Sequence, residues 1–247
     1  MRTSPTSATM PGRWGSRDDP PMTTPDFLLT VLLPAIGGGL LITLSLVACS
    51  APFGLLTGIG VALGRTYGSP FTASVCRLFV LLVKGCPLLI LLFIIYFGLP
   101  SVGIRFSAFV ASVLGFILCN GAYSSEYIRG ALASIRDGQM TAALALGMTR
   151  GQAIRYVMLP QAMQRAIPGI ANEMIYLIKY SSLAYMLTCI EVTGAGKIVA
   201  ARYFTYTETF AVVGLVYLAL VTIATWVANY LEERYRIPGM VNAGEPI

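Results

Sequence analysis

Long hydrophobic segments separated by short polar ones make up most of this 247-residue chain. A helix needs about 20 apolar residues to cross a bilayer, so these segments predict membrane spans. The first stretch carries no charge between Asp26 and Arg65, which is too long for one simple span and too short for two spans with a loop. A proline and three consecutive glycines divide it, and such residues commonly mark breaks. We therefore expect a short interfacial helix over residues 27–36 and a first span over residues 40–63.

Four further hydrophobic segments follow the first. They predict spans at residues 77–99, 107–127, 166–189 and 209–231. The second of the five spans is interrupted by Lys84-Gly85-Cys86-Pro87. The fold class that follows is an all-α integral membrane protein with about five transmembrane helices over residues 27–236. Residues 1–26 are expected to form a disordered external tail and residues 237–247 a cytoplasmic tail.

Five spans place the two chain ends on opposite sides of the membrane, and the distribution of lysine and arginine selects the inner side. One side would hold nine of these residues, namely Arg65, Arg77, Arg129, Arg136, Arg150, Arg155, Arg165, Arg234 and Arg236. The other would hold six, namely Arg2, Arg13, Arg17, Arg105, Lys197 and Arg202. The C-terminus is therefore expected to be cytoplasmic and the N-terminal tail external, in a bacterial-type cytoplasmic membrane.

The composition narrows the class of protein further. Hydrophobic residues make up 56% of the chain and charged residues 11%, against about 25% charged residues in soluble domains. Histidine is absent, so an imidazole base or metal ligand is excluded. The five cysteines show no C-x-x-C spacing and are interpreted as buried structural thiols, with no metal site. The net charge of +6 fits the cytoplasmic arginines of a membrane protein, with no nucleic acid partner.

The longest cytoplasmic loop is expected between the third and fourth spans, over residues 129–165. Asp137-Gly138 is a turn signal, and the segment from Thr141 to Gly147 is rich in helix-forming Ala and Leu. Thr141 would be the N-cap of a short helix, and Gly147 its C-terminal cap. A helix at this place has no lipid around it, so it would dock into a groove of a soluble partner. The alternative is that the helix packs on its own protein.

Several motifs occur in a characteristic order along the chain. In the loop they are Thr141-Ala142-Ala143 with Gly147 and, after nine intervening residues, Val157-Met158-Leu159-Pro160. In the spans they are Lys84-Gly85-Cys86-Pro87, Tyr96-Phe97-Gly98-Leu99-Pro100, Asn120-Gly121-Ala122-Tyr123 with Glu126 and Arg129-Gly130, and Asn172-Glu173 with Lys179-Tyr180-Ser181-Ser182-Leu183 and Glu191. The loop resembles the EAA loop of ABC importer permeases, and the other motifs resemble the polar amino acid branch of that family. The resemblance covers about residues 39–236.

This resemblance implies the fold of a type I ABC importer permease and a function as the transmembrane permease subunit of an importer for polar amino acids. The residues implied in coupling to a separate ATPase subunit are Thr141, Ala142, Ala143, Gly147, Leu159 and Pro160. The other implied partners are a second permease copy or a sister permease, an extracytoplasmic solute-binding protein and the amino acid substrate. ATP would be bound by the partner subunit, so the chain would have no cofactor and no catalytic residue of its own. The sequence departs from the family pattern at Thr141, Lys84 and Tyr180, where the pattern has Glu, Arg and Asp.

Polar and charged residues inside the spans are candidates for the substrate pathway, because each would cost a few kcal/mol if it faced lipid. They are Asn120, Glu126, Asn172, Glu173, Lys179, Ser181 and Ser182. Carboxylates would meet the ammonium group of an amino acid, and amides and hydroxyls its carboxylate. The alternative is that Glu126 and Lys179 only hold helices or a dimer partner together. Glu173 and Lys179 are six residues apart and cannot form an i,i+4 pair.

Functions of two other classes are less consistent with the sequence. An intramembrane enzyme would need a nucleophile with a base or a metal cluster, and the spans contain neither histidine nor paired aspartates. A stand-alone secondary transporter or channel would have no use for a docking loop, and the five spans show no two-fold repeat. Gly194-Ala195-Gly196-Lys197 looks like the end of a P-loop, but Glu191 and Ile198 occupy positions that require Gly and Ser or Thr. The sequence leaves open which amino acid is carried and whether the permease is a homodimer or a heterodimer.

Overall fold

The structure, a computed structural model, describes residues 24–136 and 138–235. Asp137 and most of the two predicted tails lie outside these residues. Every regular element in the described part of the chain is helical, which agrees with the all-α expectation.

The first span is one continuous helix. α1 (Thr24–Phe27), a π-helical turn at Leu28–Leu32 and α2 (Leu33–Tyr67) follow one another without a break, so the predicted break at the glycine run is wrong. Gly39 is buried there, and an added Cβ would lie 2.8 Å from the carbonyl carbon of Glu191. The glycine therefore permits close approach of another segment and does not end the helix.

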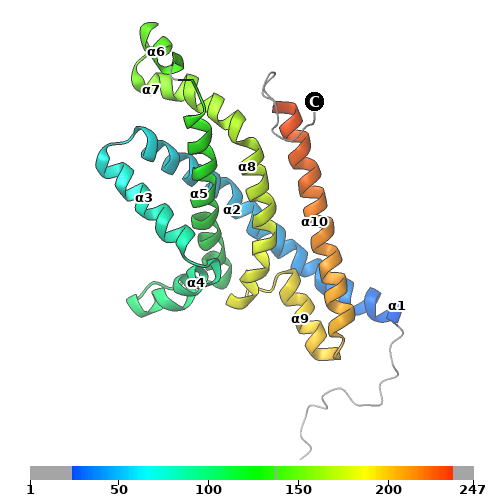
Figure 1. Ribbon diagram of the computed structural model, residues 1–247. Coiled ribbons are helices and arrows are strands. Elements are labelled where there is room, and N and C mark those ends of the chain that lie inside the picture. The colour runs from blue at the N-terminus through cyan, green and yellow to red at the C-terminus, as the bar shows by residue number, and fades with distance from the viewer. Residues whose placement is uncertain (1–23, 137, 236–247) are drawn as a thin grey trace, which may run out of the picture.

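α2 is too long to cross a membrane upright. With the preceding turn it forms a candidate span of 40 residues, Leu28–Tyr67. At about 1.5 Å per residue this is about 60 Å, roughly twice the thickness of the hydrocarbon core. The helix must therefore tilt or extend beyond the bilayer. Figure 1 shows it running obliquely behind the central helices.

The second span is sharply bent. α3 (Pro70–Gly85) and α4 (Leu88–Phe93), which continues through a π-helical turn at Ile94–Gly98 and a 3₁₀ turn at Leu99–Val102, meet at an angle of 105°. The interruption predicted at Lys84-Gly85-Cys86-Pro87 is confirmed. The span begins seven residues before the predicted start at residue 77, because the side chain of Ser69 caps α3 by accepting a hydrogen bond from the Thr72 N–H.

α5 (Ala108–Ala133) is the central helix of the bundle. Its N-cap is Ser107, whose hydroxyl oxygen accepts a hydrogen bond from the Val110 N–H at 3.3 Å. Phe116 and Ile128 are buried at two levels of this helix. The third predicted span is confirmed, with a helix that continues to Ala133 where residue 127 was expected as its end.

The loop after α5 folds into α6 (Gly138–Ala145), α7 (Arg150–Ala153) and a π-helical turn at Ile154–Met158. The prediction of Thr141 as N-cap is wrong, because α6 begins three residues earlier and Thr141 lies in its interior. The cap at Gly147 is confirmed by its positive φ of 85°. The Gly147 N–H donates to the Leu144 carbonyl, and the Met148 N–H donates to the Ala143 carbonyl at 3.1 Å, the two bonds of a Schellman motif.

The remaining spans are formed by α8 (Leu159–Tyr180), α9 (Val192–Tyr203) and α10 (Tyr206–Tyr235). α8 continues into a 3₁₀ segment, Ser181–Leu187, and a bend of 50° separates this segment from α9. The described residues thus contain three unbroken helices able to cross a membrane, and five spans when each bent pair counts as one.

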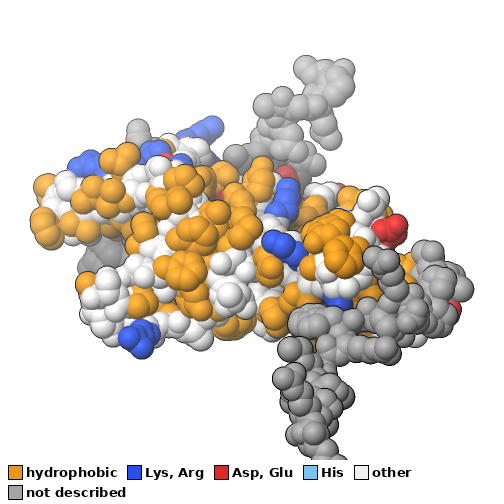
Figure 2. Space-filling model, turned by 90° about the horizontal axis from the view of Figure 1, so that it is seen from below, with side chains coloured by type: hydrophobic (Ala, Val, Ile, Leu, Met, Phe, Trp, Pro, Cys, Tyr) orange, Lys and Arg blue, Asp and Glu red, His pale blue; other side chains and the backbone are white. Residues whose placement is uncertain are grey.

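The helices form an elongated bundle, and different elements lie at its two ends. Figure 1 shows α6 and α7 beyond one end, whereas α4 and α9 lie toward the other. Seen from this second end, the molecule shows hydrophobic side chains over much of its described surface and few charged ones (Figure 2). Large apolar side chains such as Leu41, Phe71 and Leu215 are more than half exposed. A surface of this kind is suited to lipid.

Hydrogen bonds at the start of α9 connect this helix to α2 and α10. The Glu191 side chain is fully buried and accepts hydrogen bonds from the Thr193 N–H at 2.8 Å, the Gly194 N–H at 2.9 Å and the Tyr217 hydroxyl at 2.6 Å. The Val192 N–H donates to the hydroxyl of Thr43 on α2. The Glu191 carboxylate therefore caps α9 and connects it to α10, and the neighbouring Val192 N–H connects it to α2.

Replacing Glu191 with Ala is expected to lower the free energy of unfolding by about 2–4 kcal/mol, because the cap is lost and the Tyr217 hydroxyl loses its acceptor. Unfolding of the detergent-solubilised protein in a denaturant titration measures this change. Glu191→Gln keeps an acceptor oxygen and should lose less than half as much. Equal losses for the two variants would contradict the capping role.

Candidate functional site

A cavity of about 360 Å³ lies at the bend between α3 and α4, a volume within the range of ligand pockets. Cys86 and Pro87 have extended backbone conformations, so the helix stops there and leaves space beside it. The lining residues come from three segments: Val83, Lys84, Gly85, Cys86, Pro87 and Leu88 at the bend, Cys119 and Tyr123 on α5, and Tyr180 at the end of α8. The Nζ atom of Lys84 lies 5.0 Å from the centre of the Tyr123 ring, a cation–π contact.

Glu173 supplies a negative charge close to this cavity. It is 2% exposed and lies on the side of α8 that is buried in the bundle. Its carboxylate interacts electrostatically with Lys84, and also with Tyr123 and Tyr180. A buried carboxylate within a span is destabilised by the loss of water, and the positive charge of Lys84 offsets part of this cost from a distance, without an ion pair between the two side chains. The structure thus brings the predicted pathway residue Glu173 together with a lysine from another span.

The opposite side of α8 presents polar residues at its surface. Its exposed residues include Gln164, Asn172, Tyr176 and Lys179. Its buried residues are Ala162, Ala166, Glu173 and Leu177. The Nζ atom of Lys179 lies 4.7 Å from the centre of the Tyr176 ring, and Tyr176 stacks on Tyr180 at 5.9 Å. The predicted pathway residues Asn172 and Lys179 are therefore on this exposed face, whereas Glu173 faces the interior.

The other predicted polar residues of the pathway lie inside the packing or bond to their own helix. Asn120 is 1% exposed at the crossing of α5 with α2, and among the described residues neither atom of its amide has a hydrogen-bond partner. The Ser181 hydroxyl is buried and donates to the Ile178 carbonyl. The Ser182 hydroxyl donates to the Lys179 carbonyl. Of these three residues, none lines the cavity.

Glu126 forms ion pairs near the end of the bundle that carries α6. Its Oε1 accepts from Arg65 of α2 at 2.5 Å, and its Oε2 accepts from Arg129 at 2.9 Å. Arg65 is the more buried arginine, with its side chain 15% exposed against 44% for Arg129. This arrangement supports the structural alternative for Glu126, which holds α2 against α5.

Replacing Arg65 with Met is expected to lower the free energy of unfolding by about 1.5–3 kcal/mol, because a partly buried charged hydrogen bond is lost. The same change at the exposed Arg129 should cost less than about 1 kcal/mol. Neither change should alter which solute is transported. Unfolding titrations combined with uptake competition measure both effects, and a changed solute preference in the Arg65 variant would contradict the structural role.

The loop beyond the bundle exposes a small apolar surface. Leu146 is 82% exposed and Leu144 45%, and Thr141, Ala142 and Gly147 are exposed beside them. Ala143, in contrast, is 4% exposed because it packs on its own chain. Leu159 is partly buried, and Pro160 is exposed at the start of α8. Four of the six implied contact residues are thus exposed, Leu159 is partly buried, and Ala143 packs inside the loop against its own chain.

Sequence reasoning missed several cavity residues as parts of a site. Tyr123 and Tyr180 belong to recognised motifs, and Cys119 directly precedes one. None of the three was predicted to line a pathway, because their meeting depends on how α5, α8 and the bend pack. The signal present in the sequence was a lysine directly before a Gly-Cys-Pro break in a hydrophobic span. The prediction that all cysteines are buried is also wrong: Cys119 and Cys189 are buried, Cys49 is exposed, and Cys86 lines the cavity. Within the described ranges no group of three or more Cys, Asp or Glu residues could hold a metal ion.

Bent spans around a polar cavity and a folded loop outside the bundle define a membrane component of a transport system. The chain belongs to the family of binding-protein-dependent transport system inner membrane components, which it matches over residues 50–237.

Proteins similar to this chain are amino acid permeases. The probable amino-acid ABC transporter permease protein YckA of Bacillus subtilis is 38% identical, and the match covers 74% of this chain and 80% of YckA. The glutamine transport system permease protein GlnP of Escherichia coli is 32% identical, and the match covers 83% of this chain and 94% of GlnP. A crystal structure of an amino acid ABC transporter with histidines superposes with a TM-score of 0.75 at 29% identity, covering 82% of this chain and 94% of the other. The membrane subunit fold of the MetNI methionine transporter matches with a TM-score of 0.65.

Proposed function

We propose that this chain is the permease subunit of an ABC importer for polar amino acids. It forms the translocation pathway with a second copy or a sister permease, and it couples that pathway to a separate ATPase that binds the ATP. An extracytoplasmic binding protein delivers the amino acid. The observation that carries this proposal is the exposed polar face of α8, which includes Asn172 and Lys179.

This polar face needs a neighbour other than lipid. An exposed amide or ammonium group in a span costs a few kcal/mol in hydrocarbon, so such residues face a partner chain or a water-filled path. A second permease placed against α8 would give these polar side chains a neighbour other than lipid. It would also enclose a path between the two subunits. Glu173 and the cavity at the bend lie on the other side of the same helix segment, where Tyr180 belongs to the cavity wall.

The exposed leucines of the loop support a soluble partner. Leu144 lies on α6 and Leu146 directly follows this helix, which is outside the bundle, where no lipid would cover them. An amphipathic helix of this kind typically binds in a groove of another protein. The partner proposed is the ATPase, and the buried Ala143 fixes the helix on its own chain so that movement of the ATPase is passed to α8.

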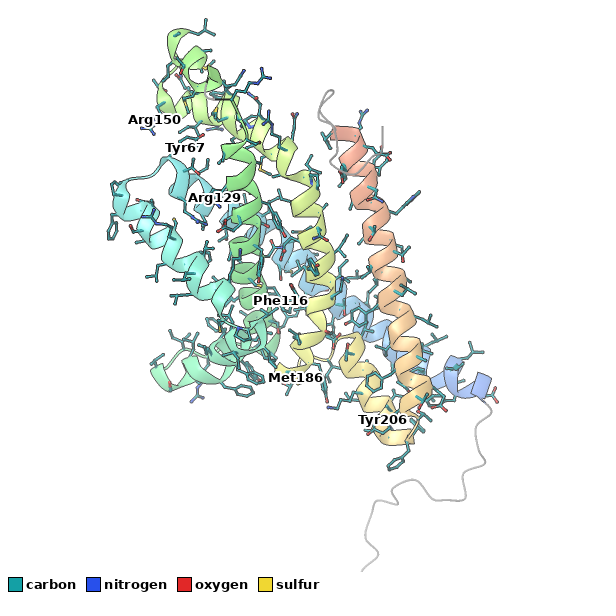
Figure 3. The ribbon with its side chains drawn as sticks, viewed as in Figure 1. Tyr67, Phe116, Arg129, Arg150, Met186 and Tyr206 are labelled. Atoms are coloured by element: carbon teal, nitrogen blue, oxygen red, sulfur yellow. The ribbon has the colours of Figure 1, made fainter. Side chains whose placement is uncertain are left out.

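The distribution of arginines supports the proposed orientation. Figure 3 shows Arg129 and Arg150 at the end that carries α6 and α7, whereas Tyr206 lies at the opposite end. Positive residues accumulate on the cytoplasmic side. The loop end and the C-terminal end of α10 would therefore be cytoplasmic, and α1 would be on the external side.

The relatives support the substrate class. Their names include permease proteins for glutamine, arginine and L-cystine, all polar amino acids. The transfer of this class to the present chain is part of the proposal.

Co-purification tests the proposal. The tagged chain is extracted in mild detergent from its own membranes, and proteins present in stoichiometric amount are identified. A P-loop ATPase is the expected partner, and a sister permease in the same sample would make the complex a heterodimer. Recovery of the chain alone, with transport that continues without ATP, would favour a stand-alone carrier.

A further inference from the structure

An arginine closes the base of the loop that carries α6 and α7. Arg165 lies on α8, and its Nη1 atom donates hydrogen bonds to the carbonyl oxygen of Ser134 at 2.5 Å and to the hydroxyl oxygen of the same residue at 2.9 Å. Ser134 is the C-cap of α5. The last carbonyl groups of a helix lack partners within it and carry partial negative charge. Arg165 therefore caps α5 from a different helix, 31 positions further along the chain.

The guanidinium group of Arg165 is part of the packing at this place. Its Nε atom is buried, so the group does not simply extend into water. Beside it, Ala162 of α8 is buried in one apolar cluster with Leu132 and Ile135 from the end of α5. Apolar packing holds two segments together without fixing a direction, whereas charged hydrogen bonds also fix their relative position. The contact with Ser134 thus sets how the end of α5 lies against α8.

The two helices that meet at Arg165 are connected to the loop in different ways. α7, the π-helical turn and α8 belong to one helical segment, Arg150–Leu187, along which a movement of the loop can pass. α5, in contrast, ends at Ser134, and Ile135 and Arg136 after it are not helical. A non-helical connection can bend and absorb a movement, whereas a rigid element transmits it. The hydrogen bonds from Arg165 give the end of α5 a second connection, through α8.

Both helices also carry part of the wall of the cavity at the bend. Cys119 and Tyr123 are on α5, and Tyr180 is at the end of α8. A movement of α8 alone would displace Tyr180 and leave the other two residues behind. A joint movement of both helices would shift this part of the wall as one unit against the bend between α3 and α4. Figure 1 shows α6 and α7 beyond the ends of α5 and α8, where a partner could displace both.

We propose that Arg165 is a positioning residue of the transport cycle, which joins the ends of α5 and α8 so that a movement of the loop displaces both helices together. The inference rests on the proposed import function and adds to it a residue that lies behind the surface facing the ATPase. Arg165 acts through Ser134 and contacts neither ATP nor the transported solute.

The complete importer complex in liposomes measures this role as the number of amino acid molecules taken up per ATP hydrolysed. Arg165→Met keeps an apolar stem and removes the guanidinium group. It is expected to lower this ratio by about fivefold or more, while ATP hydrolysis stays within about twofold of the wild-type rate. Arg165→Lys retains a cation that can donate to the Ser134 carbonyl and should keep more than about half of the ratio.

Two further variants make the test specific. Arg77 is exposed on α3 and donates a hydrogen bond to Ser74 of its own helix, so Arg77→Met should leave the ratio unchanged. Ser134→Ala removes one of the two acceptors of Arg165 at an exposed position and should lower the ratio by about twofold. This milder variant keeps the test decisive if Arg165→Met does not fold, because an unchanged ratio in Ser134→Ala would contradict the inference.

The outcomes separate the inference from the proposed function. A merely structural role of Arg165 would reduce uptake, ATP hydrolysis and the yield of folded complex in proportion, and the unchanged ratio would overturn the inference. An equal fall of the ratio in Arg77→Met would also overturn it, because the effect would then not depend on the contact with Ser134. Wild-type uptake that needs no ATP would instead contradict the proposed function itself.

Discussion

Replacing Leu146 with Glu is expected to reduce ATP-driven uptake by about a hundredfold or more, with little effect on the stability of the permease. Leu146 is 82% exposed, so the change removes no packing within the chain. In a groove of the ATPase, however, the variant would lose the burial of a leucine, worth about 1.5–3 kcal/mol, and would place an unpaired charge at the interface. Uptake by vesicles and the amount of co-purified ATPase measure the effect.

Leu146→Met is the matched control for this prediction. It keeps an apolar side chain of similar volume and should retain most of the uptake and the bound ATPase. Normal uptake by the Leu146→Glu variant would show that the exposed leucine is not part of a coupling surface. Loss of folded permease in that variant would show instead that Leu146 supports the chain's own structure.

Replacing Gly54 with Ala is expected to lower the free energy of unfolding by about 3 kcal/mol or to prevent folding. Gly54 is buried where α2 crosses α5, and an added Cβ would lie 2.9 Å from the Cβ of Asn120 and closer still to its amide oxygen. Asn120 is itself 1% exposed and cannot move aside without shifting α5. Overpacking in such a place costs about 1–3 kcal/mol and sometimes more.

Gly60, six residues further along α2, provides the control. An added Cβ there meets no atom within 4 Å. Gly60→Ala should therefore be neutral or stabilise the helix by up to about 1 kcal/mol, because alanine has the higher helix propensity. Denaturant titrations of the two variants measure the contrast. A similar stability of both variants would mean that α2 and α5 do not approach as closely as the structure indicates.

These glycines also show what the sequence could predict of the fold. Hydrophobic length predicted the spans, and Lys84-Gly85-Cys86-Pro87 predicted the bend, since Pro87 prevents a helix from continuing through it. The run Gly37–Gly39 also predicted a break, because consecutive glycines commonly interrupt a helix. Whether a glycine ends a helix or permits a close contact depends on its neighbours in space. The backbone of Glu191 lies beside Gly39, and residues so far apart in the sequence cannot be paired from the local pattern.

The candidate site was predictable to a smaller extent. The charge within the fourth span made Glu173 a candidate, because a charge in hydrocarbon requires a partner, but its proximity to Lys84 was not predicted. The same reasoning included Glu126 without revealing Arg65, which is 61 positions earlier in the chain and pairs with it only through the crossing of α2 and α5. The lining by Tyr123 and Tyr180 depends on the same tertiary packing. Local patterns therefore identified the kind of chemistry, and the packing decided which residues share a cavity.

Uptake by the purified complex reconstituted in liposomes tests whether the chain is the permease subunit of an ATP-driven importer. The complex is inserted with its partner ATPase and binding protein, and a radiolabelled polar amino acid such as L-glutamine is supplied outside, with ATP enclosed or omitted. Accumulation that requires enclosed ATP and is lost when the ATPase subunit is left out is the result that this account predicts. Accumulation that proceeds without ATP, or with this chain alone, would contradict it.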